Sequence, residues 1–201
     1  MESLKTGDIL LCRGDSGDDM IDKVIEDFTH SPYIHVGMII KDPWWLNLKG
    51  TFVYQSNRGP NGYPDVINPK LIKGVTLNHL TDFLNGRQYV EVRSLSSIKW
   101  NQNNKDTFQK IFEETYNKPY DMKICEWICV GIGSFFKCEC FSNAIIPKET
   151  DTFWCSSLVA YIYSKMHWID SDVNWSSQTP DDLSKIEVIY PAILDKPKRI
   201  K

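Results

Sequence analysis

The segment YIHVGMII, residues 33–40, constrains the fold of this 201-residue chain more than any other part of the sequence. Its β-branched residues favour a strand, which would place Val36 and Met38 on one face and His35 and Ile39 on the other. A second run of this kind, TFVYQS, follows after the segment KDPWWLNLKG, which has the composition of a hairpin connection. The two runs therefore predict a pair of neighbouring antiparallel strands.

The rest of the chain completes the pattern of an α+β fold. Short apolar runs indicate further strands at residues 6–12, 74–77, 88–95 and 186–194. Apolar residues at helical spacing indicate helices at residues 18–28, at residues 106–116 and from Cys155 onward. Hairpins and helices are segregated rather than alternating, which is typical of an α+β fold with an antiparallel sheet. The length fits one domain of ordinary size.

The charge and the hydropathy pattern argue against two classes of protein. The chain carries 26 acidic and 23 basic residues, so its net charge is −3 and nothing predicts a basic surface for nucleic acid. No apolar run approaches the roughly 20 residues that a membrane-spanning helix requires. The first residues, MESLKTGD, do not resemble a secretory signal. We therefore expect a soluble, cytoplasmic protein without a nucleic-acid partner.

In a reducing compartment we expect the cysteines to be free thiols, metal ligands or nucleophiles rather than disulfide partners. The chain has six of them, namely Cys12, Cys125, Cys129, Cys138, Cys140 and Cys155. The four between residues 125 and 140 resemble a zinc site only loosely, because the first pair is too widely spaced and no histidine lies nearby. We therefore expect no bound metal.

Cys155 stands at the start of a predicted helix, in the segment FWCSSLVAYIY. It shares a face with Leu158, Val159 and Ile162, and a buried, inert thiol is the ordinary explanation of that position. The helix start offers another, because unpaired N–H groups and the helix dipole stabilise a thiolate and lower the thiol pKa. The same N–H groups can also bind an oxyanion. Cys155 is thus a candidate nucleophile.

A thiol nucleophile needs a general base, and the base needs an acceptor that orients it. Of the four histidines, only His35 lies in the middle of a predicted strand, beside Gly37, whose missing side chain leaves room for the imidazole. Gln55, on the second strand of the hairpin, can face the same side and offer its amide oxygen to the ring. For both residues a purely structural role is the alternative.

Five segments, in order, resemble a known family. GDILL, YIHVGMII, VYQS, NKPYD and FWCSSLVAYIY are similar to the circularly permuted branch of the NlpC superfamily. This branch of papain-like cysteine hydrolases has YiiX-like and poxviral members and is distantly similar to the lecithin:retinol acyltransferase group. The resemblance covers Thr6 to Tyr163 and leaves residues 122–150 unmatched.

The resemblance implies a single permuted papain-like domain over residues 1–201. Its antiparallel sheet would pack against the helix that bears the nucleophile, and the catalytic residues would be Cys155, His35 and Gln55. The branch commonly has a glutamate in the third place, and this chain departs from it with Gln55. The resemblance implies thiol acyl chemistry without a metal or an organic cofactor.

Three functions remain open. The first is a thiol hydrolase that cleaves a peptide or isopeptide bond through an acyl-enzyme on Cys155. The second is a lipid acyl hydrolase or acyltransferase, for which Trp44, Trp45 or the apolar segment 124–136 would make a peripheral membrane contact. The third is a catalytically silent module of the same fold that binds a lipid or a peptide.

Overall fold

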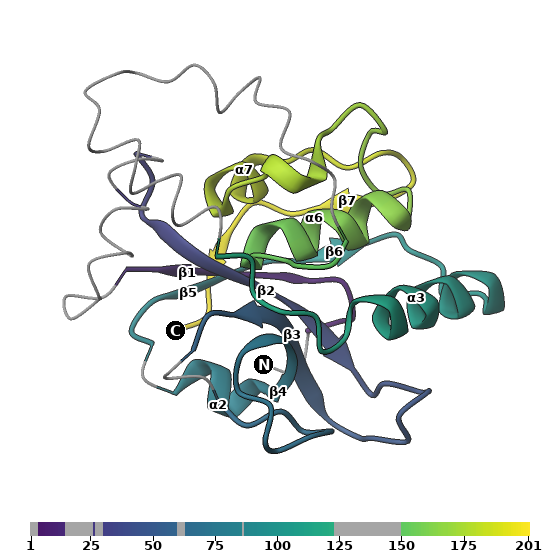
Figure 1. Cartoon of the computed structure of the whole chain (residues 1–201). Coiled ribbons are helices and arrows are strands. Elements are labelled where there is room, and N and C mark those ends of the chain that lie inside the picture. The colour runs from purple at the N-terminus through teal and green to yellow at the C-terminus, as the bar shows by residue number, and fades with distance from the viewer. Residues whose placement is uncertain (1–3, 15–25, 27–29, 60–62, 86, 123–149) are drawn as a thin grey trace.

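The structure is a computed structural model that describes residues 4–14, 26, 30–59, 63–85, 87–122 and 150–201 (Figure 1). Apart from one residue, the predicted helix at 18–28 lies outside these ranges. The apolar segment 124–136 and the four cysteines between residues 125 and 140 also lie outside them.

The main sheet is antiparallel and has six strands in the order β4-β3-β2-β1-β5-β8. The strands are β1 (Ile9–Arg13), β2 (Tyr33–Lys41), β3 (Thr51–Asn57), β4 (Gly74–His79), β5 (Val90–Arg93) and β8 (Lys198–Arg199). The hairpin predicted from the two β-branched runs is confirmed, because β2 pairs with β3.

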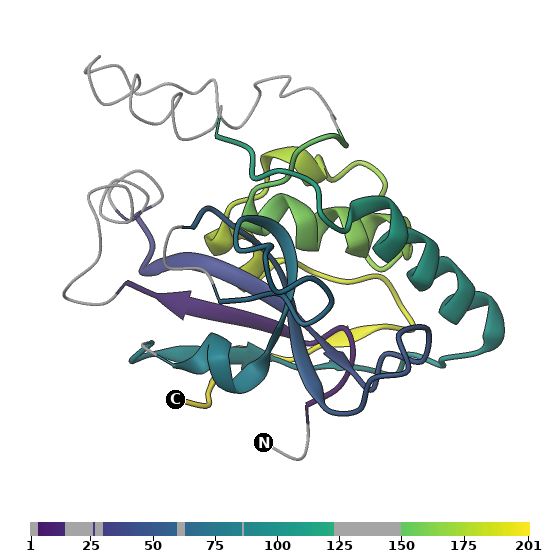
Figure 2. The same ribbon diagram turned by 60° about the horizontal axis from the view of Figure 1, so that its bottom comes forward.

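Helices lie on both faces of this sheet. They are α2 (Leu80–Leu84), α3 (Gln102–Thr115), α6 (Cys155–Lys165), the 3-10 helix η1 (Trp175–Ser177) and α7 (Pro180–Lys185). Figures 1 and 2 place α6 and α7 on one side of the sheet and α2 on the other. A small sheet pairs β6 (Leu95–Ser96) with β7 (Ile193–Leu194). The predicted α+β fold with an antiparallel sheet is thus confirmed.

The alternation along β2 divides the core into two layers. Val36 and Met38 belong to the larger cluster, which contains Leu158 of α6. Ile39 belongs to the smaller cluster on the opposite face, with Phe83 of α2. Period-two alternation explains this division and confirms the two predicted faces of the strand. His35 shares the parity of Ile39 and therefore lies on the α2 side.

Helix α3 begins four residues before the predicted start. The side chain of Asn101 caps it by accepting a 2.9 Å hydrogen bond from the Asn104 N–H group. The first turn is polar and carries no apolar spacing, so the sequence pattern begins only where the helix reaches the core. Asparagine is among the residues most favoured at this cap position.

The strand predicted at residues 186–194 is wrong except at its end, where β7 comprises Ile193–Leu194. Ile189, Tyr190 and Ile193 are exposed, with Tyr190 at 91%, whereas Ala192 is buried and Ile186, Val188 and Leu194 pack against the core. Pro191 has no N–H group for a ladder, and the Ile189 N–H donates instead to the Trp168 carbonyl. Residues 186–192 therefore form an irregular segment, although their apolar composition is typical of a buried strand.

No helix in the described part of the chain is both long and apolar enough to cross a lipid bilayer.

Candidate active site

Strands β2 and β3 separate at the candidate site. Their pairing ends at Met38 and Tyr54, whereas β3 stays paired with β4 as far as Asn57 and Gly74. The end of β2 that carries His35 therefore lies beyond the last pair. This separation leaves space between neighbouring strands, where side chains from both can meet.

His35 and Gln55 meet in this space. The distance between His35 Nε2 and Gln55 Oε1 is 2.6 Å, which is a short hydrogen bond. Gly37 makes the approach possible, because a Cβ atom there would lie 2.6 Å from Val53 Cγ1 and 3.5 Å from Gln55 Cβ. The Phe83 ring flanks the imidazole, with 6.0 Å between the centroids. The expected contact between the Gln55 amide oxygen and the His35 ring is present.

A buried polar network continues from Gln55 to β4. Gln55 Nε2 donates a 2.8 Å hydrogen bond to Asn78 Oδ1, which also accepts one of 2.9 Å from Thr76 Oγ1. Asn78 Nδ2 donates to the carbonyls of Tyr63 and Pro64, at 2.8 and 3.0 Å. Gln55, Thr76 and Asn78 are fully buried. Sequence reasoning missed Asn78, because the strand predicted at residues 74–77 ends one residue before it, whereas β4 extends to His79.

Cys155 is the first residue of α6, as the sequence predicted. The segment before it is anchored at Phe153, whose carbonyl accepts hydrogen bonds from Ser56 Oγ at 2.5 Å and from the Asp121 N–H at 3.1 Å. The Phe153 N–H donates to the Pro119 carbonyl at 3.1 Å. The Ser56 bond attaches the segment before α6 to the end of β3, and the other two attach it to residues 119–121.

The Cys155 thiol lies against β2, where the backbone of Val36, the neighbour of His35, hydrogen-bonds to it and favours the thiolate. The backbone of Ser156 and the charge of Arg58 act in the same direction. Burial outweighs all three, and it raises the pKa of Cys155 to about 11. The lowered pKa expected from the helix start is therefore wrong for this closed arrangement, in which Cys155 is only 4% exposed.

The surroundings of His35 favour a neutral imidazole. Burial of the ring and the positive charge of Arg87 lower its pKa to about 3, and the hydrogen bond that Gln55 Oε1 accepts from the ring only partly offsets them. Arg58 contributes in the same direction as Arg87. Both pKa shifts favour a thiol and a neutral imidazole over a thiolate and an imidazolium. Within the described residues, no hydrogen bond joins the thiol to the imidazole.

Two arginines near the site were missed by sequence reasoning. The charge of Arg58, which follows β3 directly, acts on both His35 and Cys155. The Arg87 guanidinium lies 4.1 Å from the centroid of the Phe83 ring, and it also donates to the Phe83 carbonyl. Both arginines lie outside helices and strands, so the periodicity of the sequence does not predict which way their side chains point.

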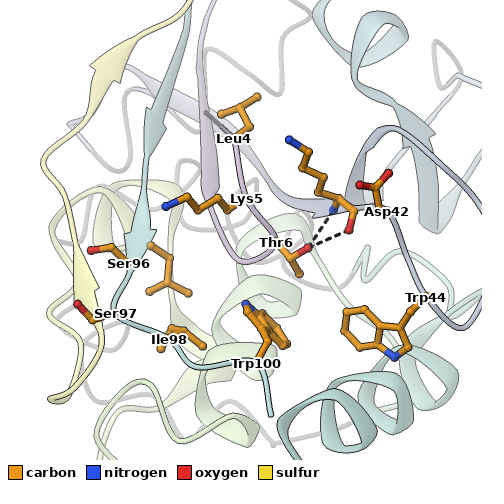
Figure 3. A pocket seen from close by; sticks show the side chains of 11 residues that line it. Leu4, Lys5, Thr6, Asp42, Trp44, Ser96, Ser97, Ile98 and Trp100 are labelled. Carbon is orange, nitrogen blue, oxygen red and sulfur yellow. Dashed lines mark hydrogen bonds between the residues drawn. The ribbon is translucent and has the colours of Figure 1, made fainter. Parts of the chain in front are cut away.

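A pocket of about 440 Å³ lies elsewhere in the molecule (Figure 3). Thr6, Trp44 and Trp100 are among the residues that line it, and none of the three predicted catalytic residues does. It opens beside Lys41, six residues along β2 from His35, or about 20 Å at about 3.3 Å per residue. This pocket is thus separate from the candidate active site.

Trp44 and Trp45 pack on α3. Their ring centroids are 4.6 Å apart, and those of Trp45 and Phe112 are 5.1 Å apart. Trp44 also contacts Phe108, with 6.2 Å between centroids. The two indoles cover the aromatic side of the helix. Contact of this pair with a membrane stays a prediction, as does contact through the segment 124–136.

The similarity of the chain to known proteins lies in its fold. No protein-family model matches the sequence, and no curated protein matches it significantly. The crystal structure of the metalloprotein YiiX from Escherichia coli O157:H7 (DUF1105) is similar, with a TM-score of 0.51 and 19% sequence identity. The alignment covers 81% of this chain and 66% of the YiiX chain. The similarity supports a YiiX-like fold, and this chain spans about two thirds of that protein's length.

YiiX is described as a metalloprotein, which raises the question of a metal site in this chain. Within the described ranges, no three histidine, cysteine or acidic side chains cluster in a way that could hold a metal ion. The loosely spaced cysteines between residues 125 and 140 lie outside those ranges. Among the described residues, neither Cys155 nor His35 therefore belongs to a set of three such ligands.

Proposed function

We propose that the protein is a cysteine hydrolase with a circularly permuted papain-like domain of the NlpC superfamily. Cys155 would attack an amide carbonyl, His35 would act as the base and Gln55 would orient it. The observation that carries the proposal is the 2.6 Å hydrogen bond between His35 and Gln55, together with the bond between Cys155, the first residue of α6, and the backbone of Val36, which follows His35. A nucleophile, a base and an orienting acceptor are the three parts that this chemistry needs.

The reaction starts from neutral partners. As Cys155 Sγ bonds to the carbonyl carbon, its proton passes to His35, and the carbonyl oxygen becomes an oxyanion. The Cys155 N–H group at the start of α6 is one donor for this oxyanion, and the positive charge of Arg58 favours it. The C–N bond then breaks, and the leaving amine takes the proton from His35.

The acyl-enzyme is resolved by water. His35 removes a proton from the water as its oxygen attacks the thioester carbonyl, and it returns that proton to the departing Cys155 sulfur. The product is a carboxylic acid, and the enzyme regains its thiol and neutral imidazole. We favour an amide over a lipid ester because amide cleavage is the broader chemistry of the resembled superfamily.

A silent binding module is the second candidate, and one observation favours it. The thiol is buried, its pKa is raised to about 11, and no hydrogen bond from the described residues joins it to the imidazole. An active enzyme of this kind needs a substrate that opens access to the sulfur and aligns it with His35. A binding module needs neither.

Acylation of the thiol tests the proposal. The protein is incubated with an activated thioester and with a matched activated amide, and intact mass followed by peptide mapping locates the acyl group. We expect it on Cys155, and His35→Ala should lower the acylation rate by at least about a hundredfold. His167→Ala is the control and should change it little. Acylation elsewhere, or at the same rate in His35→Ala, would overturn the assignment.

A further inference from the structure

We infer that Asn78 is a positioning residue that fixes the orientation of the Gln55 amide and, through it, the tautomer of His35. The orientation of the two amides follows from the hydrogen bonds alone. The catalytic consequence of that orientation rests on the proposed function. The network that carries the inference runs from two backbone carbonyls, through two side-chain amides, to the imidazole.

The orientation of Asn78 follows from the carbonyls of Tyr63 and Pro64. Both lie within hydrogen-bond distance of one terminal atom of the Asn78 side chain, at 2.8 and 3.0 Å. A backbone carbonyl can only accept, so this atom must be the NH₂ nitrogen. The other terminal atom is therefore the oxygen. The Thr76 hydroxyl, which bonds that oxygen, could donate or accept and does not decide the orientation.

The orientation of Gln55 follows from that of Asn78. The Asn78 oxygen can only accept, and the Gln55 atom that faces it lies 2.8 Å away. This atom must be the Gln55 NH₂ nitrogen, because two oxygens at that distance would repel each other. The Gln55 oxygen is thereby turned toward His35, at 2.6 Å from Nε2.

The tautomer of His35 is the last step. Since the Gln55 oxygen can only accept, Nε2 must carry a proton. In a neutral imidazole the proton is then absent from Nδ1, which becomes the basic nitrogen. The carbonyls of Tyr63 and Pro64 thus determine, through the uncharged side chains of Asn78 and Gln55, which ring nitrogen of His35 carries the proton.

The same network explains why an amide rather than a carboxylate suits position 55. A glutamate could accept from His35, but it could not donate to Asn78, and two acceptor oxygens would face each other. Rotating the Asn78 amide would not help, because its oxygen would then face the carbonyls of Tyr63 and Pro64. Only a side chain that accepts at one end and donates at the other completes the path.

Nitrogen-15 NMR of the full-length protein tests the inference. With labelled histidine, long-range proton–nitrogen correlations identify which ring nitrogen of His35 is protonated. In the wild type at neutral pH we expect the Nε2–H tautomer alone. Finding the Nδ1–H tautomer in the wild type would overturn the inference, and this measurement needs no variant that could fail to fold.

Two variants separate Asn78 from its surroundings. Asn78→Leu removes the polarity of the path, and a mixture of both tautomers should appear. Thr76→Val removes one partner of the Asn78 oxygen but leaves the two carbonyls, so it should keep the Nε2–H form. An unchanged tautomer in folded Asn78→Leu, or an equal shift in Thr76→Val, would contradict the assignment.

Kinetics give the catalytic consequence. Asn78→Leu should lower kcat about tenfold with little change in KM, because the bound substrate meets the productive tautomer less often. A reduced kcat with a pure Nε2–H signal would count against the positioning role. If the wild type shows the Nε2–H tautomer but never acylates Cys155, the proposed hydrolase fails while the orientation inference stands.

Discussion

The Ser56 hydroxyl donates a 2.5 Å hydrogen bond to the carbonyl of Phe153, a residue 97 positions further along the chain. Ser56 directly follows Gln55, and Phe153 precedes Cys155 by two residues. This buried bond therefore connects β3, the strand that carries Gln55, with the segment that leads into Cys155. The bond therefore fixes the position of the segment before Cys155 relative to the end of β3.

Ser56→Ala is expected to weaken that connection. Loss of the bond should cost about 0.5–1.5 kcal/mol of unfolding free energy, because the Phe153 carbonyl keeps the Asp121 N–H as a second donor. Urea denaturation measures the cost, and the acylation rate of Cys155 should fall with it. Ser171→Ala, at an exposed loop position, is the matched control. Equal stability of the two variants would show that the bond contributes nothing.

The thiol should be slow to alkylate at neutral pH. Because burial raises the pKa of Cys155 to about 11, the thiolate fraction in the folded protein rises about tenfold per pH unit up to that value. Iodoacetamide labelling between pH 6 and pH 10, followed by peptide mapping, measures this dependence. The same peptide in denaturant should react with the profile of an ordinary thiol. Rapid labelling of folded Cys155 at pH 6 would restore the lowered pKa that the helix start suggested.

His35 should stay neutral well below its ordinary pKa. Its pKa is lowered to about 3 in the folded protein, against about 6.5 in the unfolded chain, so folding excludes the charged form. The resulting stability is complete above about pH 6.5 and is lost as the pH falls toward 3. Stability measured from pH 7 to pH 4 should decline less in His35→Ala than in the wild type. Parallel declines would place the His35 ring in water.

Arg87→Gln is expected to raise the pKa of His35, because a positive charge near the ring disfavours imidazolium. An NMR titration of the imidazole measures the shift. Arg199→Gln serves as the control, since its guanidinium lies over Tyr89 at the edge of the sheet. A larger shift in the control than in Arg87→Gln would contradict the assigned cause.

Gly37→Ala should disturb the meeting of β2 and β3. The new methyl would lie 2.6 Å from Val53 Cγ1, and overpacking of this kind costs about 1–3 kcal/mol. Thermal denaturation measures the loss. Adding Val53→Ala removes the clashing methyl group, so the double variant should recover part of the stability lost in Gly37→Ala. A double variant with no recovery would mean that Gly37 matters for another reason.

The sequence allowed the pairing of His35 with Gln55 to be predicted, because period-two alternation and a short hairpin limit which side chains share a face. Asn78 escaped prediction because its role depends on β4 lying next to β3, and that neighbour is separated from the hairpin by a loop. The thiol pKa escaped for a different reason. Local position at a helix start favours a thiolate, but burial is a property of the assembled fold, and here it outweighs the local effect.

The separation of β2 from β3 beyond Tyr54 changes how the two strands are held together at the candidate site. His35 is held by the pairing of β2 with β1, and Gln55 is held by the pairing of β3 with β4. The 2.6 Å bond between His35 and Gln55 therefore joins the two strand ends through side chains, where the backbone pairing has stopped. A substitution that removes this bond should loosen the sheet as well as change the site.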